Sequence, residues 1–162
     1  METPADIAKA YFVALSRHDL DAAEGWWHDD IAEDFTPIGE FHGKAALRAY
    51  FAEMFAAAPD FALEVIRIVG DETTAVVQWR ATGTFTGAPF QGILATGRPI
   101  EIRGVDVMQV RDGKVQANTI YYDGLTFARQ IGLLPSEGSL PDRALMTGFN
   151  VRTRGLKLLK RG

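Results

Sequence analysis

The 162-residue sequence contains no cysteine, which excludes disulfide bonds, thiolate nucleophiles and cysteine-ligated metals. No apolar run approaches the roughly 20 residues that a membrane-spanning helix needs. The N-terminus lacks the basic and then hydrophobic pattern of a secretory signal. We therefore expect a cytoplasmic protein.

Several short catalytic motifs are also missing. The sequence has no GxxxxGK[ST] phosphate loop, no GxGxxG dinucleotide motif and no Gly-x-Ser-x-Gly nucleophile elbow. Its three histidines, His18, His28 and His42, lie in separate segments without the spacing of paired metal ligands. We therefore expect neither a metal nor a cofactor.

The net charge of −4 is distributed unevenly. Residues 1–138 hold 11 Lys/Arg against 20 Asp/Glu, whereas residues 139–162 hold six against one. The acidic body argues against nucleic acid as a partner. We expect a folded domain over residues 1–135 and a basic, partly apolar tail over residues 136–162. The tail is interpreted either as a helix docked on the body or on a partner subunit, which we favour, or as a segment that contacts a membrane surface or an acidic partner.

The residue pattern of the N-terminal half predicts mainly helices. Thr3-Pro4-Ala5-Asp6 predicts a helix start with Thr3 as the cap, and this helix continues to about Arg17. Asp19 can cap a second helix over Leu20–Trp27. A third amphipathic helix is expected over Gly43–Ala58, after short strands over Ile31–Gly39 and Glu40–His42.

The residue pattern of the C-terminal half predicts strands. Phe61–Val69 and Thr73–Phe85 form one predicted hairpin, and Pro99–Val110 and Val115–Asp123 form another around Asp112-Gly113. Helices and antiparallel strands that are segregated along the chain indicate an α+β fold.

A regular second hairpin would pair Val110 with Val115 and Asp106 with Thr119. One face would then carry the residues Ile102, Gly104, Asp106, Met108, Val110, Val115, Ala117, Thr119, Tyr121 and Asp123. Buried carboxylates are costly unless they are paired or used, so we look for function on this face. The opposite face combines apolar and amide side chains, which suggests an interface: Val105, Val107, Gln109, Gln116, Asn118, Ile120 and Tyr122.

Several short motifs, in this order, are similar to those of one known family. They are His18-Asp19-Leu20-Asp21, Phe41-His42-Gly43, Gly83-Thr84-Phe85-Thr86-Gly87, Thr96-Gly97-Arg98, Asp112-Gly113-Lys114-Val115, Asp123 and Gln130-Ile131-Gly132-Leu133. Over about residues 4–135 the chain resembles the SnoaL-like branch of the nuclear-transport-factor-2-like superfamily.

The resemblance implies a cone-shaped barrel in which a strongly curved, mainly antiparallel sheet packs on three N-terminal helices around a deep pocket. Members include polyketide cyclases, ketosteroid isomerases, epoxide hydrolases, dehydratases and binding proteins without a known reaction. Many form homodimers through the outer sheet face, and we expect a homodimer here. SnoaL-like cyclases often have a histidine at the position of Phe85 and an acidic residue and a tryptophan on the last strand, where this chain has Ala117 and Thr119.

Asp123 is the first catalytic candidate, because SnoaL-like enzymes commonly have their acid/base aspartate at this position and an apolar cavity raises a carboxyl pKa. The alternative is a helix cap at Asp123-Gly124. Asp106 is the second candidate, and its alternative is a structural pairing with Arg80, Arg103 or a helix terminus.

Tyr121, Thr119 and Arg80 could donate hydrogen bonds to a carbonyl group or an enolate. An apolar wall for a small hydrophobic ligand is predicted from Trp27, Phe41, Met54, Phe55, Trp79, Phe85 and Met108. The favoured hypothesis is an enzyme that uses Asp acid/base chemistry on a carbonyl or epoxide substrate. The alternative is a ligand-binding or scaffolding domain without chemistry.

Overall fold

The computed structural model describes residues 2–159, so Met1 and residues 160–162 of the predicted tail lie outside it. Five helices are present in this range: α1 (Pro4–Ser16), α2 (Leu20–Gly25), α3 (Lys44–Ala57), α4 (Gly124–Gln130) and α5 (Leu140–Leu159). The predicted caps are confirmed. Thr3 and Asp6 form a capping box on α1, and the Asp19 side chain accepts a hydrogen bond from Ala22 N on α2.

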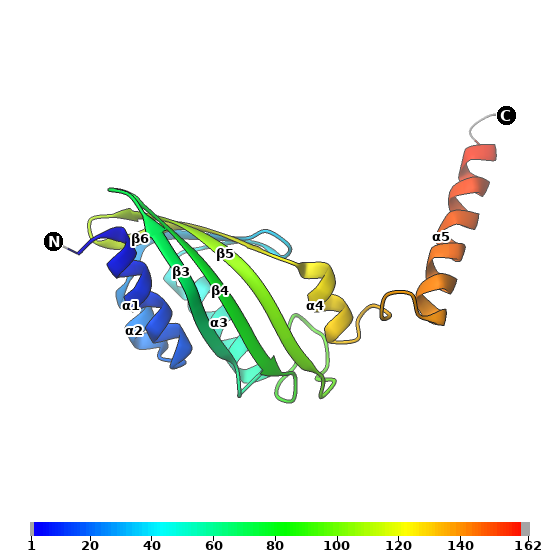
Figure 1. Cartoon of the computed structure of the whole chain (residues 1–162), viewed down its shortest axis with the longest axis horizontal. Coiled ribbons are helices and arrows are strands. Elements are labelled where there is room, and N and C mark those ends of the chain that lie inside the picture. The colour runs from blue at the N-terminus through cyan, green and yellow to red at the C-terminus, as the bar shows by residue number, and fades with distance from the viewer. Residues whose placement is uncertain (1, 160–162) are drawn as a thin grey trace.

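The strands form one six-stranded sheet with the order β2-β1-β6-β5-β4-β3 (Figure 1). β1 pairs with β6 in parallel, and the other neighbours are antiparallel. The strand bounds are β1 (Trp27–Phe35), β2 (Gly39–His42), β3 (Ala62–Gly70), β4 (Thr74–Thr84), β5 (Pro99–Arg111) and β6 (Lys114–Tyr122). The α+β prediction is confirmed, although the sheet curls around the helices without closing into a barrel.

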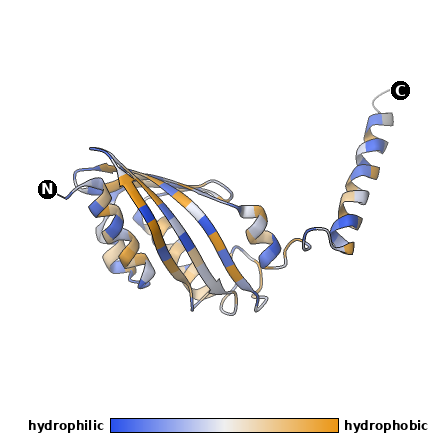
Figure 2. Cartoon of the chain, viewed as in Figure 1, coloured by the Kyte–Doolittle hydropathy of each residue, from blue (hydrophilic) through white to orange (hydrophobic). Residues whose placement is uncertain are grey.

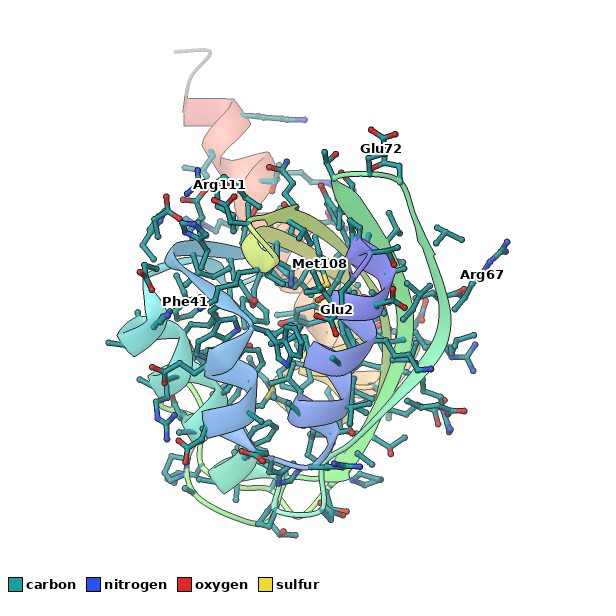
Figure 3. The ribbon with its side chains drawn as sticks, turned by 90° about the vertical axis from the view of Figure 1, so that its left-hand side faces the viewer. Glu2, Phe41, Arg67, Glu72, Met108 and Arg111 are labelled. Atoms are coloured by element: carbon teal, nitrogen blue, oxygen red, sulfur yellow. The ribbon has the colours of Figure 1, made fainter. Side chains whose placement is uncertain are left out.

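Hydrophobic and hydrophilic residues alternate along parts of the strands (Figure 2), as expected where successive side chains point to opposite faces of a sheet. Met108 points into the interior and is fully buried, whereas Arg67 and Glu72 project outward (Figure 3). The concave face packs on α1 and α3 and forms the core. It is also the face that any internal site must use.

The hairpin between β5 and β6 has the predicted turn but not the predicted register. Asp112 and Gly113 both have positive φ, at 53° and 73°, as the two-residue turn requires. Gln109 pairs with Ala117 while Val110 pairs with Val115, so Gln116 is an extra residue in a β-bulge.

Beyond the bulge, each residue of β6 faces the side of the sheet opposite to the predicted one. Met108 lies opposite Asn118, and Asp106 lies opposite Ile120. Asn118, Ile120 and Tyr122 therefore turn inward, whereas Ala117, Thr119 and Tyr121 turn outward. The predicted faces are correct for β5 and wrong for β6 beyond the bulge.

The predicted tail contains a helix, α5. Its first turn is held to the body, since Arg129 Nη2 lies 3.5 Å from Asp142 Oδ1 and Gly138 N donates to Asp142 Oδ2. Beyond that turn α5 projects from the body of its own chain (Figure 1). Docking on a partner subunit stays a prediction. Within residues 2–159, no helix combines the length and apolar character needed to cross a membrane.

Candidate functional site

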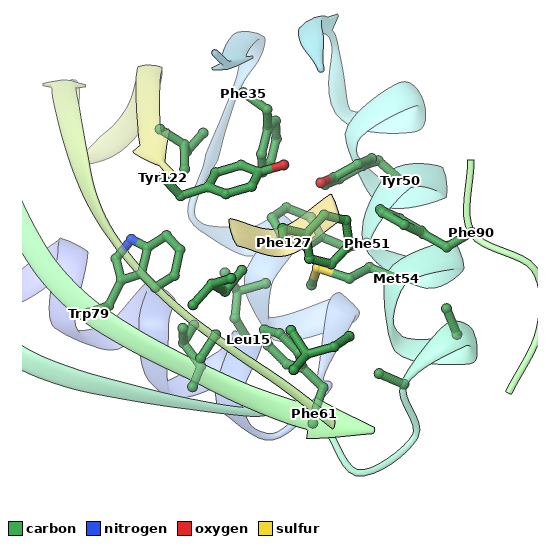
Figure 4. Close-up of a pocket in the computed structure, with 18 of the residues that line it drawn as sticks. Leu15, Phe35, Tyr50, Phe51, Met54, Phe61, Trp79, Phe90, Tyr122 and Phe127 are labelled. Atoms are coloured by element: carbon green, nitrogen blue, oxygen red, sulfur yellow. The ribbon is translucent and has the colours of Figure 1, made fainter. Parts of the chain in front are cut away.

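A cavity of about 110 Å³ lies between the concave face of the sheet and the helices α1, α3 and α4 (Figure 4). Aromatic and aliphatic side chains make up most of its wall, as expected for a small-molecule pocket. The apolar lining includes Phe12, Leu15, Phe35, Phe51, Met54, Phe61, Leu63, Trp79, Phe85, Phe90, Ile100, Ile102, Ile120 and Phe127. The acidic side chains in the lining are Glu33 and Asp106.

Four strands bring polar side chains together on the concave face. Glu33 on β1 lies opposite Asn118 on β6, and Asn118 is two residues from Ile120, which lies opposite Asp106 on β5. On β4, Trp79 is two residues from the position opposite Asp106, and its side chain reaches the same part of the concave face. The parallel pairing of β1 with β6 therefore joins residues that are 85 positions apart in the sequence.

Asp106 is buried and held by two donors. Trp79 Nε1 donates to its Oδ1 at 2.6 Å, and Asn118 Nδ2 donates to its Oδ2 at 2.8 Å. Burial raises the pKa of Asp106 to about 6, against the opposing effect of these hydrogen bonds. Asp106 is thus paired, as the structural alternative predicted, but its partners are Trp79 and Asn118, whereas Arg80 and Arg103 both pair with Glu101 on the opposite face.

Glu33 is 1% exposed and accepts a hydrogen bond from the Tyr11 hydroxyl at 2.9 Å. Burial, reinforced by the charge of Asp106, raises the pKa of Glu33 to about 8, while the hydrogen bond from Tyr11 opposes the rise. At pH 7 Glu33 therefore holds a proton while Asp106 is mostly ionised. The two carboxyl groups have opposite protonation states in one pocket.

Two buried oxygens here, Glu33 Oε2 and Asn118 Oδ1, lack a hydrogen-bond partner among the described residues. They belong to residues that lie directly opposite one another on neighbouring strands. Buried polar atoms are nearly always satisfied, and a proton on Glu33 supplies a donor between two acceptors. The neutral state of Glu33 thus agrees with its surroundings.

Gly104 gives the Trp79 indole the space to reach Asp106. A Cβ atom at position 104 would lie 2.2 Å from Trp79 Cζ2 and 2.7 Å from the Tyr121 carbonyl oxygen. Such contacts are far inside van der Waals distance. Any larger residue at position 104 would therefore displace the indole and break its hydrogen bond to Asp106.

The structure brings together part of the predicted site. Asp106, Met54, Trp79 and Phe85 line the pocket as expected. The other members of the predicted wall lie elsewhere: Trp27, Phe55 and Met108 are buried in the core, and Phe41 packs at its edge. Thr119, predicted as a hydrogen-bond donor to the substrate, lies on the outer face of the sheet.

The other two predicted catalytic residues lie outside the pocket. Tyr121 is 54% exposed on the outer face, because the bulge turns it away. Asp123 is the exposed N-cap of α4, and its carboxylate accepts hydrogen bonds from Thr126 N at 2.9 Å and Thr126 Oγ1 at 2.6 Å. These hydrogen bonds lower the pKa of Asp123. The placement of Asp123 agrees with the capping alternative.

Sequence reasoning missed Glu33 and its neighbours Tyr11 and Asn118. A signal for Glu33 was present, since Ile31, Glu33 and Phe35 alternate and all three are buried on one face of β1. An acidic residue in an apolar alternation is unusual for a strand that packs on a core. Asn118 could not be found in this way, because its face depends on the bulge.

The curled sheet and the helices enclose an apolar pocket, and this arrangement agrees with a match to a known family. The family model described as SnoaL-like polyketide cyclase matches residues 5–131. The chain belongs to this family. None of the curated proteins matches this SnoaL-like chain.

Solved structures of low sequence identity share the fold of this SnoaL-like protein. AclR of Streptomyces galilaeus, a proposed hydroxylase, is 24% identical with a TM-score of 0.70, over 80% of this chain and 95% of AclR. IdmH of Streptomyces antibioticus, a proposed polyketide cyclase, is 23% identical with a TM-score of 0.69, over 81% and 99%. A SnoaL-like polyketide cyclase of Agrobacterium tumefaciens is 22% identical with a TM-score of 0.66, over 82% and 100%.

Proposed function

We propose that this SnoaL-like protein is an enzyme that binds a hydrophobic carbonyl compound and transfers protons with its own carboxyl groups. The observation that carries the proposal is that two buried carboxyl groups, Asp106 and Glu33, line one apolar pocket on either side of Asn118, where burial raises the pKa of both. Two carboxyl groups whose surroundings separate their pKa values can serve as base and acid.

Asp106 is the proposed base. Its carboxylate accepts a proton from the carbon next to the substrate carbonyl, and the C–H electron pair moves to form an enolate. The hydrogen bonds from Trp79 and Asn118 fix the carboxylate in one orientation, and its remaining lone pairs can take up the proton.

Glu33 is the proposed acid. When substrate is bound, its carboxyl proton turns from Asn118 Oδ1 to the enolate oxygen and stabilises it, and Tyr11 positions the group by donating to Oε1. Return of the proton from Asp106 to a different carbon completes an isomerisation. Alternatively, attack of the enolate carbon on a second carbonyl of the same molecule closes a ring, and the new alkoxide takes the proton held by Asp106.

One observation favours a second candidate, a binding domain without chemistry. Both oxygens of Asp106 already accept a hydrogen bond, as in a purely structural polar cluster. In that case the pocket binds the same class of hydrophobic molecule and releases it unchanged.

Deuterium exchange separates the two candidates. The bicyclic ketone 2-tetralone is incubated with the protein in D₂O, and loss of its α-proton signals is followed by NMR. We expect the native protein to accelerate exchange, with the acceleration reduced about 10²–10⁴-fold in Asp106→Asn and about 10²-fold in Glu33→Gln.

Two variants serve as controls for this exchange. Asp123→Asn keeps the α4 cap and Tyr121→Phe changes only an exposed hydroxyl, so both should exchange 2-tetralone at the native rate. Native exchange in Asp106→Asn would contradict the assignment of the base. Binding of 2-tetralone without any acceleration of its exchange would favour the second candidate.

A further inference from the structure

Two tyrosine hydroxyls form a second polar region of the pocket. The proposed proton transfer does not use this region. Tyr50 comes from α3 and Tyr122 from the end of β6, and both line the cavity. Figure 4 shows their hydroxyl groups turned toward one another from opposite walls. Tyr50 is only 5% exposed, so most of its side chain is removed from bulk water.

Neither hydroxyl forms a hydrogen bond with another protein group in the described part of the chain, nor do the two bond to each other. Each hydroxyl therefore has its hydrogen free for an oxygen atom that enters the pocket. Their surroundings are aromatic, with Phe35, Phe51, Phe90 and Phe127 nearby. An oxygen atom between the two hydroxyls would satisfy both.

The two tyrosines remain neutral donors at physiological pH. Burial raises the pKa of Tyr50 well above its ordinary value and raises the pKa of Tyr122 to about 12. A carbonyl or hydroxyl oxygen has two lone pairs and can accept a hydrogen bond from both phenols at once.

The tyrosine pair is displaced from the carboxyl pair along the pocket. Ile120 lies opposite Asp106, and Tyr122 follows two residues further along the same face of β6. Two residues of strand correspond to roughly 7 Å. Ile120, which separates Asn118 from Tyr122 on the inward face of β6, contributes an apolar side chain to the pocket wall.

We propose that Tyr50 and Tyr122 bind a second oxygen atom of the substrate, so that this site selects flat, apolar molecules with oxygen functions at both ends. The inference deepens the proposed function and rests on it only in assigning the first oxygen to the carboxyl end. The tyrosine pair acts in binding and specificity, not in proton transfer.

Two matched probes test this assignment by isothermal titration calorimetry at pH 7. The probe 2,6-dihydroxynaphthalene carries an oxygen at both ends, and 6-methyl-2-naphthol replaces one of them by a methyl group of similar size. We expect the native protein to bind the diol about tenfold more tightly, the contribution of one good hydrogen bond. In the double variant Tyr50→Phe/Tyr122→Phe this preference should fall to about one.

The control is Tyr121→Phe, which removes the same hydroxyl group from the outer face and should keep the tenfold preference. Equal binding of the two probes by the native protein would overturn the proposal. So would an undiminished preference in the double variant, or no binding of the diol up to about 1 mM. Because the ratio of affinities cancels the contribution of the carboxyl end, it tests the tyrosine pair even if no turnover is found.

Discussion

Among single residues, Glu33 and Asp106 differ most from their ordinary behaviour. Each would be ionised at neutral pH in water, but the sheet and α1 remove both from solvent. Asp106 retains two strong donors, and Glu33 has one donor and a charged neighbour. Burial raises the pKa of both groups, and the charge of Asp106 raises that of Glu33 further.

The raised pKa of Glu33 makes stability depend on pH. The unfolded chain releases this proton near pH 4.5, whereas the folded chain keeps it up to about pH 8. Glu33 therefore favours the folded state most below pH 4.5, and this contribution is lost as the pH rises through 8.

Glu33→Gln keeps an acceptor for Tyr11 and removes the titration. We expect the variant and the native protein to unfold at similar urea concentrations at pH 4.5, and the variant to be more stable at pH 9. Since each pKa unit corresponds to about 1.4 kcal/mol, the gain should be on the order of a few kcal/mol. Glu72→Gln, at the exposed turn before β4, should show no such dependence. A variant less stable than the native protein at pH 9 would contradict the neutral state of Glu33.

At the scale of elements, β6 decides which residues reach the pocket. Its first residues follow the regular register of the Asp112-Gly113 turn, and Val115 is fully buried. The extra residue Gln116 then exchanges the faces, so that Ile120 is 4% exposed and Tyr121 is 54% exposed. Without the bulge, Ile120 would face outward and Tyr121 would face inward.

A pair of adjacent substitutions tests this register. Ile120→Thr places a hydroxyl in the core and removes buried carbon atoms, and we expect a loss of about 2–4 kcal/mol of unfolding free energy. Tyr121→Thr changes an exposed side chain and should alter stability by less than about 0.5 kcal/mol. Chemical denaturation at a protein concentration below that of self-association provides both values. A larger loss for Tyr121→Thr than for Ile120→Thr would show that β6 has the regular register.

At the scale of the whole molecule, apolar side chains gather on two surfaces, the outer face of the sheet and α5. A row across the outer sheet face brings Val69, Val76 and Val107 side by side on β3, β4 and β5. Along α5 the exposed apolar residues include Leu145, Met146, Phe149 and Leu156. Such surfaces are typical of interfaces, and in a dimer the basic α5 would complement the acidic body of the second copy.

We therefore predict a homodimer that uses the outer sheet face. Light scattering at micromolar concentration should give the mass of two chains, and Val107→Glu should shift the protein to the mass of one by placing a charge in the valine row. Val13→Glu makes the same change on α1, away from the sheet face, and should leave the dimer intact. A native protein that scatters as a single chain would refute the prediction.

The order of helices and strands could be predicted because its signals are local. Thr3, Asp19 and Asp123 each cap a helix with their own side chain, and Asp112-Gly113 supplies the positive φ values of a tight turn. Asp106 could be predicted to face inward from its own strand. These features depend on interactions between neighbours in the chain, which the sequence displays directly.

The candidate site depends on interactions between distant strands. Glu33 and Asn118 meet because β1 pairs in parallel with β6, and Asn118 faces inward because one residue bulges out of β6. Thus the amino-acid order alone determined the α+β class, the caps and the hairpin turn. Only the tertiary structure decided which acidic groups share the pocket, since a shift of one residue in a strand exchanges its two faces and burial then sets the pKa of whatever side chain turns inward.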